Sequence, residues 1–120
     1  MIGIDNIIYS KSYSFALRII KAYQYLTNEK KEFVLSKQML RSGTSIGAMV
    51  REAKFAQSKA DFINKLSIGL KEANETLYWL ELLKDSGYLD SLSFNSIHSD
   101  ANELVSILAS IVKTSKKDKS

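Results

Sequence analysis

Apolar residues recur along much of the chain at spacings of three and four, which is the pattern of a helix with one buried face. The most regular run predicts a helix over residues 34–57, and an earlier run predicts one over residues 7–26. The predicted inward stripes are Tyr13, Ala16, Leu17, Ile20 and Tyr23 in the first helix and Leu35, Met39, Ser42, Ile46, Met49, Ala53 and Ala56 in the second. The first helix carries another apolar stripe beside its predicted inward one, formed by Phe15, Ile19, Ala22 and Leu26.

Two further helices follow. Ser58 with Asp61 resembles a shortened capping box and Gly87 is a typical stop, so the third helix is expected over residues 58–86. The fourth is expected over residues 94–112. Their inward stripes are Phe62, Leu66, Leu70, Ala73, Leu77 and Leu80 in the third helix and Ile97, Ala101, Leu104, Leu108 and Ile111 in the fourth. Four helices joined by short connections predict an all-α, antiparallel up-down-up-down four-helix bundle.

The composition agrees with one helical domain. The chain has 120 residues, no proline and no cysteine; long helices avoid proline, and without cysteine no disulfide or thiolate metal site can form. The N-terminal segment lacks the basic start and apolar run of a signal peptide, and no segment reaches the roughly 18 to 20 apolar residues of a membrane span. We therefore expect a soluble, cytoplasmic protein without a membrane partner.

The net charge of +4 is concentrated near the C-terminus. The last eight residues hold Lys113, Lys116, Lys117 and Lys119 against one aspartate, so residues 1–112 carry a net charge of only +1. We expect a bundle domain over residues 1–112 followed by a basic, flexible tail over residues 113–120. The tail is interpreted either as a solvated helix end or as a contributor of phosphate contacts to RNA or DNA.

Two glycines interrupt the second predicted helix, in the stretch RSGTSIGAMVRE at residues 41–52. Gly43 and Gly47 fit neither a phosphate-binding P-loop nor a dinucleotide-binding fingerprint, because both motifs need other glycine spacings and a preceding strand. Each glycine in a helix interior costs about 0.5–1 kcal/mol relative to alanine. The pair, four residues apart on one face, therefore predicts close contact with a second helix, within the chain or from another subunit; a kinked functional turn and a tolerated accident are the alternatives.

Charged residues also fall on or beside the faces of helices two and three. We predict a polar cluster in which an arginine of the second helix meets a glutamate of the third, because an unpaired buried charge costs several kcal/mol. The candidates are Arg41, Arg51, Glu52, Glu72 and Glu75. The alternative is a set of solvated side chains that make weak neighbour pairs, such as Asp61 with Lys65.

No catalytic or metal motif accompanies these charges. The only histidine, His98, has Asn95 three residues before it, so the Glu-x-x-His motif of di-iron bundles is absent. No serine, histidine and aspartate arrangement can be built around it with any specificity. We expect no enzyme activity and no cofactor.

The segment LYWLELL at residues 77–83 is apolar nearly all round. A helix of this kind is buried nearly all round, which a single four-helix bundle does not provide. We therefore predict a homo-oligomer with Tyr78, Trp79, Leu82 and Leu83 at its interface, and a wide bundle core is the alternative.

Two blocks of sequence resemble the bacterial four-helix-bundle proteins of the 23S ribosomal RNA intervening-sequence family. The first is the R-S-x-T-S-I-x-A block at residues 41–48, and the second is the K-E-A-x-E-T-x-Y-W-L block at residues 71–80. The resemblance implies a ring-like homopentamer and no catalytic residues. Similar accessory proteins of diversity-generating retroelements bind nucleic acid through a basic surface and partner a reverse transcriptase. Many relatives carry Asn-Ile-x-Glu-Gly where this chain has Met49 to Ala53.

Two functions follow as hypotheses. One is a non-enzymatic homo-oligomer that binds RNA or DNA through basic surfaces repeated by symmetry. The other is a structural or adaptor module that docks a protein partner through apolar patches and binds no nucleic acid.

Overall fold

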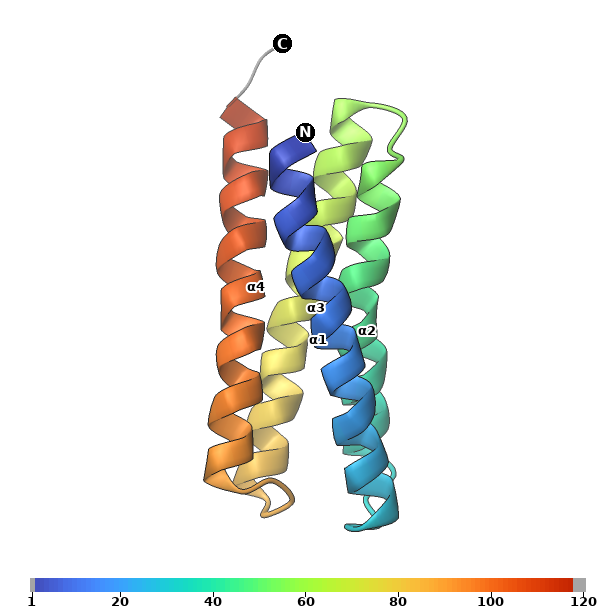
Figure 1. The fold of residues 1–120 in the computed structure, drawn as a ribbon, viewed down its shortest axis with the longest axis vertical. Helices are drawn as coiled ribbons and strands as arrows, with labels where there is room; N and C mark the ends of the chain where they lie inside the picture. The colour runs from blue at the N-terminus through green and yellow to red at the C-terminus, as the bar shows by residue number, and fades with distance from the viewer. Residues whose placement is uncertain (1, 118–120) are drawn as a thin grey trace.

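The computed structural model describes the backbone of residues 2–117 and the side chains of residues 7–117. Its four helices are α1 (Ile2–Asn28), α2 (Leu35–Lys54), α3 (Lys59–Asp85) and α4 (Ser91–Lys117). Each helix packs against the next one along the chain, and α1 also contacts α4, in a particle of 50 × 20 × 20 Å (Figure 1). The predicted all-α, up-down-up-down four-helix bundle is therefore confirmed.

The boundaries of α3 agree with the sequence signals. The Ser58 hydroxyl accepts a hydrogen bond from the Asp61 amide at 3.0 Å, which satisfies one of the free N–H groups of the first turn. At the other end Gly87 has a φ of +90°, a conformation that side chains other than glycine rarely adopt. The predicted cap and stop of this helix are confirmed.

The helix α2 begins differently from the expectation. The carboxylate of Glu32 accepts the amides of Val34, Leu35 and Ser36 at 3.1, 2.9 and 2.7 Å. Glu32 lies within the segment NEKKE, which the sequence pattern predicted only as a charged break between helices. In the structure Glu32 is buried and caps α2. At its other end α2 stops at Lys54, three residues before the predicted end, because the chain must become extended at Ser58 to cap α3.

Both ends of α4 extend beyond the predicted range. The Asp90 carboxylate accepts the amide and hydroxyl of Ser93 at 2.8 and 3.1 Å, which starts the helix one turn earlier. The prediction that residues 113–120 form a flexible tail is wrong for residues 113–117, which are helical. Since α3 and α4 have 27 residues each, the last turns of α4 lie beside the first turns of α3. Residues 118–120 lie outside the described chain.

The core occupies the bundle axis. The inward stripes predicted for α2, α3 and α4 are buried or half-buried, with Met39, Ile46, Leu80 and Leu108 fully enclosed. Five polar side chains of the described chain are also buried, namely Ser12, Glu32, Ser36, Ser42 and Thr76. Thr76 donates to the Ser42 hydroxyl at 2.9 Å, and Ser36 donates to the Glu32 carbonyl at 2.7 Å. Because the buried polar atoms of the described chain have partners, they cost little stability.

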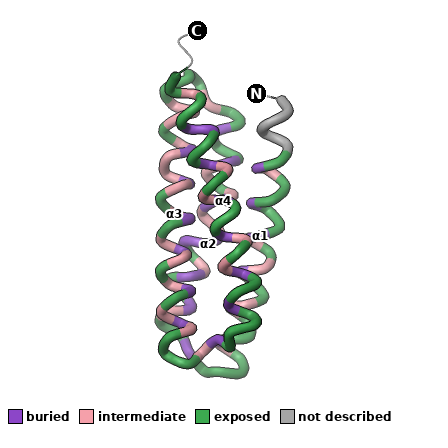
Figure 2. The backbone as a smooth tube through the Cα atoms, turned by 90° about the vertical axis from the view of Figure 1, so that its left-hand side faces the viewer, coloured by how far each residue is buried: buried purple, intermediate pink, exposed green. Residues whose placement is uncertain are grey.

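The inward face predicted for α1 is wrong. Tyr13 is 56% exposed and Leu17 49% exposed, whereas Phe15 and Ile19 of the neighbouring stripe are buried. Helix α1 is rotated so that Ile19 packs against Gly43 of α2, which leaves the other stripe outward. Figure 2 shows buried positions of α1 separated by exposed ones. The helix therefore carries two apolar stripes, and the bundle covers only one.

The contact between α1 and α4 is the least extensive of the four and is bridged by polar groups. Arg18 donates to Asp100 at 2.7 Å and to the Ser96 hydroxyl at 2.6 Å, and Lys11 pairs with Glu103 at 3.2 Å. These side chains are largely solvated, so they hold the two helices together weakly. In residues 2–117 no helix combines the length and apolar character that crossing a bilayer requires.

Candidate functional site

One end of the bundle gathers basic side chains. Lys113, Lys116 and Lys117 are exposed on the last turns of α4, and Arg51 and Lys54 are exposed on the last turn of α2. Because α2 and α4 run in the same direction, these turns reach the same end of the bundle (Figure 1). We refer to these five residues as the basic end. Lys119, the fourth lysine predicted to contact nucleic acid, lies outside the described residues.

The acidic side chains described near the basic end are already engaged. Glu52 pairs with Lys65 of α3 at 3.2 Å, and the Asp61 carboxylate accepts the Gln57 amide at 3.3 Å. Lys65 therefore pairs with Glu52 and not with Asp61, the partner suggested by the spacing. Lys65 offsets the charge of Glu52, and Asp61 keeps its own, so the described charges at this end remain positive in sum.

The opposite end of the bundle is electrostatically mixed. Its exposed lysines Lys30, Lys31 and Lys37 alternate with the acidic residues Glu29, Glu32, Asp85 and Asp90. The carboxylates of Glu32 and Asp90 cap helices there, and the pKa of each lies below its ordinary value. For Glu32, burial raises the pKa, but hydrogen bonds from three backbone amides lower it by more. The molecule is thus basic at one end and balanced at the other.

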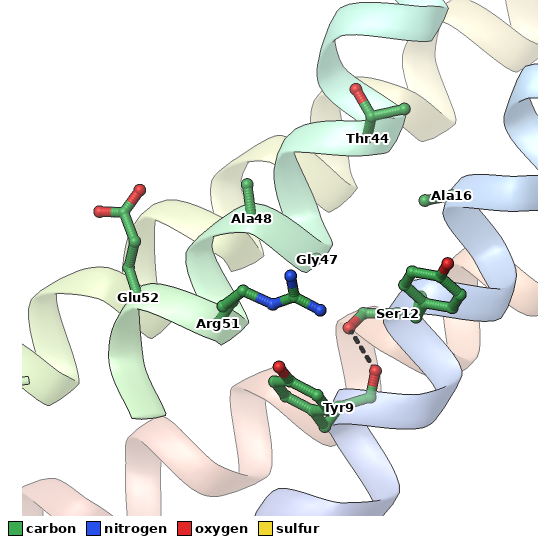
Figure 3. Close-up of a pocket in the computed structure, with 9 residues that line it drawn as sticks. Tyr9, Ser12, Ala16, Thr44, Gly47, Ala48, Arg51 and Glu52 are labelled. Atoms are coloured by element: carbon green, nitrogen blue, oxygen red, sulfur yellow. Dashed lines mark hydrogen bonds between the residues drawn. The ribbon is translucent and has the colours of Figure 1, made fainter. Parts of the chain in front are cut away.

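A groove of about 360 Å³ runs between α1 and α2 and opens near the basic end. Its lining combines small, aromatic and charged side chains, namely Tyr9, Ser12, Tyr13, Ala16, Thr44, Gly47, Ala48, Arg51 and Glu52. Tyr9 receives two cations over its ring, with the Arg51 guanidinium carbon 5.4 Å and the Lys54 ammonium 4.6 Å from the ring centroid. Figure 3 shows Arg51 reaching from α2 toward Tyr9 and Ser12 of α1.

The predicted polar cluster forms around one arginine only. Arg41 lies 3.4 Å from Glu72 and is hydrogen-bonded to Glu75, which also accepts the Trp79 indole N–H at 2.9 Å. The hydrogen bond from Trp79 lowers the pKa of Glu75 despite partial burial, and Arg41 lowers it further. The hydrogen bond with Glu75 also raises the pKa of Arg41. This half-exposed cluster links α2 to α3.

Two residues predicted for this cluster lie elsewhere. Arg51 is directed toward Tyr9 on α1, and Glu52 is paired with Lys65. The reason is helical geometry. Arg51 lies ten residues, nearly three turns, beyond Arg41, which places it far along α2 from Glu72 and Glu75.

The residues predicted for the subunit interface do not share one surface. Tyr78 is 54% exposed and meets Trp79 edge to face, with ring centroids 5.0 Å apart. Trp79 and Leu82 are half-buried. Leu83 is fully buried inside its own bundle, so it is unavailable to a second copy and its assignment to an interface is wrong. The larger exposed apolar surface is on α1, where Tyr13, Leu17 and Ile20 form one outward stripe.

Gly43 and Gly47 both face α1 of the same chain. A Cβ atom at Gly43 would lie 2.8 Å from Ile19 Cγ1, while one at Gly47 would lie 3.4 Å from the Ser12 carbonyl oxygen. Gly69 of α3, which the sequence pattern did not single out, similarly faces Met49 of α2. The glycines therefore let α1 and α3 approach α2 closely.

His98 is half-buried on α4. Its Nε2 lies 3.0 Å from a Glu81 carboxylate oxygen, and its Nδ1 lies 3.2 Å from the Asn102 amide nitrogen. Among the described residues, no group of three or more histidine, aspartate or glutamate side chains could hold a metal ion. His98 thus has structural partners on both ring nitrogens.

The comparison with known families gives the relationship of the chain. The family model for the 23S rRNA-intervening sequence protein matches residues 4–110. This chain belongs to the 23S rRNA-intervening sequence protein family. A crystal structure of a relative from Bacteroides thetaiotaomicron, a protein of unknown function from the S23 ribosomal protein family, is 58% identical, with a TM-score of 0.90. The match covers 92% of this chain and 98% of that one. No curated protein matches the chain.

Membership of the 23S rRNA-intervening sequence protein family confirms the resemblance seen in the sequence blocks. It supplies a fold and no activity, since the solved relative is itself of unknown function. Two features of the basic end were missed at the sequence level, namely Tyr9 and Lys54. The sequence pattern does not bring them together, because Tyr9 lies on α1 and the two cations lie on α2. They become neighbours only when these helices pack.

Proposed function

We propose that this chain is a non-enzymatic module that binds RNA or DNA with the basic end of its bundle. The observation that supports this function is the gathering of lysines from the last turns of α4 with Arg51 and Lys54 of α2, where Glu52, a described carboxylate nearby, is paired with Lys65. Each lysine or arginine that neutralises a phosphate releases condensed counterions, which favours binding without base recognition. A rigid helix also holds these charges in fixed positions, which a flexible tail would not do.

Assembly of several copies would strengthen such binding. We propose that the outward stripe of α1 mediates self-association, because Tyr13, Leu17 and Ile20 align at spacings of four and three and remain 37–56% exposed. In a cyclic assembly every subunit presents the same end to the same side of the ring. The basic ends would then line one rim, and several weak contacts would act together. The ring-like homopentamer implied by the resemblance is one such arrangement.

The experiment measures binding of the full chain to ribosomal RNA and to duplex DNA. The readout is the electrophoretic mobility of the nucleic acid at increasing salt concentrations. We expect a shift at micromolar protein whose midpoint rises as salt is added, because the contacts are to phosphates. A shift that does not respond to salt would contradict binding through phosphates, and no shift at low salt would contradict nucleic-acid binding altogether. The second result would favour the adaptor function, in which the α1 stripe docks a protein partner.

A further inference from the structure

The last turn of α2 holds two cations against one aromatic ring of α1. The Arg51 guanidinium carbon and the Lys54 ammonium lie 5.4 and 4.6 Å from the Tyr9 centroid, so they are at most about 10 Å apart, the sum of the two distances. Both residues are exposed. The ring therefore fixes two positive charges close together at a surface that solvent reaches.

No described carboxylate neutralises this pair. Glu52, the one acidic residue that lines the groove, is paired with Lys65. Like charges at this separation repel each other, and a tyrosine ring offsets the repulsion only in part. The negative end of the α2 dipole favours cations at this position. Figure 3, however, shows Arg51 directed across the groove toward α1 rather than toward the end of its own helix.

The groove gives a ligand access to these cations. Its volume of about 360 Å³ lies within the range of roughly 300–1,000 Å³ that small-molecule sites occupy. Gly47 and Ala48, which line the groove on the α2 side, add little side-chain bulk there (Figure 3). An anion at the groove mouth would meet a guanidinium that can donate two parallel N–H bonds and an ammonium that acts as a point charge.

We infer that Arg51 and Lys54, held over Tyr9, form a phosphate-binding position at the mouth of the α1–α2 groove. This inference rests on the proposed function and names a backbone phosphate of the bound RNA or DNA as the ligand. The position lies at the same end of the bundle as Lys113, Lys116 and Lys117, so one strand contacts both sets of charges. Tyr9 is a positioning residue that keeps the two cations together.

The test measures fluorescence anisotropy of a labelled ribosomal RNA fragment with the full chain and with the double variant Arg51→Gln, Lys54→Gln. We expect the variant to lose affinity about tenfold or more at low salt, as for a charge-assisted hydrogen bond. The slope of log affinity against log salt should fall by about 0.7–0.9, which corresponds to one phosphate. The control Lys30→Gln, Lys37→Gln makes the same charge change at the opposite end and should leave both quantities nearly unchanged.

A second measurement isolates the ring. Tyr9→Phe should bind as the unaltered chain does, whereas Tyr9→Leu should lose affinity, because only the aromatic face holds the cations. Titration with inorganic pyrophosphate should shift the Arg51 Nε–H nuclear magnetic resonance signal in the unaltered chain and in Tyr9→Phe only. If Tyr9→Leu fails to fold, the Arg51→Gln, Lys54→Gln variant still tests whether these two cations bind a phosphate.

The outcomes separate the two proposals. No binding of RNA by the unaltered chain would refute the proposed function and this inference together. Salt-sensitive binding that the Arg51→Gln, Lys54→Gln variant leaves intact would refute the inference alone. Equal losses in that variant and in the control from the opposite end would also refute it, since net charge and not position would then determine affinity.

Discussion

At the residue scale, Glu32 shows how a side chain from a charged segment can act as a structural group. Its carboxylate accepts three backbone amides at the start of α2, where the first turn has no other acceptors for its N–H groups. These bonds outweigh burial and keep its pKa below 4.5. The charge pattern of NEKKE could not reveal this role, because helix caps by glutamate depend on a tight turn that places the carboxylate over the amides.

Glu32→Gln is expected to destabilise the protein by about 1–2 kcal/mol at neutral pH, because a charged acceptor is replaced by a neutral one. A lowered pKa in the folded state means that this stabilisation is present above pH 4.5 and is lost as the pH falls through the folded value. Urea unfolding at neutral and acidic pH measures the effect. The control is Glu29→Gln, an exposed neighbour that should change little, and an equal loss at both pH values would contradict the prediction.

The cluster of Arg41 with Glu75 makes a second prediction at this scale. A double-mutant cycle with Arg41→Ala and Glu75→Ala should give a coupling of about 0.5–1 kcal/mol, because solvent screens the half-exposed arginine. The same cycle with Arg51→Ala and Glu75→Ala should be additive, since Arg51 faces α1. Chemical unfolding provides the four stabilities. Coupling through Arg51 would contradict the observed arrangement.

At the scale of elements, α1 shows why apolar periodicity can identify a helix and still select the wrong face. Its two stripes are similarly apolar, so the sequence of α1 alone does not decide between them. The decision depends on α2, where Gly43 leaves room for Ile19 and Gly47 lies against the backbone of Ser12. A buried serine on the inward face further weakened the signal.

The two glycines should respond differently to alanine. In Gly43→Ala the new methyl would lie 2.8 Å from a buried, branched side chain, so a loss of about 1–2 kcal/mol is expected. In Gly47→Ala the nearest atom is 3.4 Å away, so the higher helix propensity of alanine should leave stability unchanged or raise it by up to about 1 kcal/mol. Thermal unfolding of both variants is the measurement. Equal losses would show that both glycines are equally constrained.

The outward stripe of α1 predicts self-association. Leu17→Glu, a change at a position 49% exposed, should leave the fold intact and reduce the particle to a single copy of 13.5 kDa. Leu92→Glu is the control, because Leu92 is 82% exposed in the first turns of α4, away from the stripe. Light scattering coupled to size exclusion measures the mass. A monomeric unaltered chain, or an unchanged mass for Leu17→Glu, would contradict the role of the stripe.

At the scale of the whole molecule, the number, order and type of the four helices followed from periodicity and caps, because short connections leave few other packings. The position of the charges did not follow so simply. A tail was predicted from residue 113 because the predicted apolar stripe ends at Ile111, yet the helix continues to Lys117 beside the equally long α3. Likewise, Arg51 contacts Tyr9 of α1 and not the cluster with Glu75. Sequence spacing alone does not define distances between helices.

The account depends on the asymmetry between the two ends of the bundle. The most direct test compares the RNA affinity of two triple variants that remove the same charge, Lys113→Gln, Lys116→Gln, Lys117→Gln at the basic end and Lys21→Gln, Lys30→Gln, Lys37→Gln toward the other. At low salt, the RNA affinity of the basic-end variant should fall at least tenfold, and that of the variant toward the other end should hardly change. The slope of log affinity against log salt should become smaller only in the basic-end variant. Equal affinities of the two triple variants would contradict binding through the basic end.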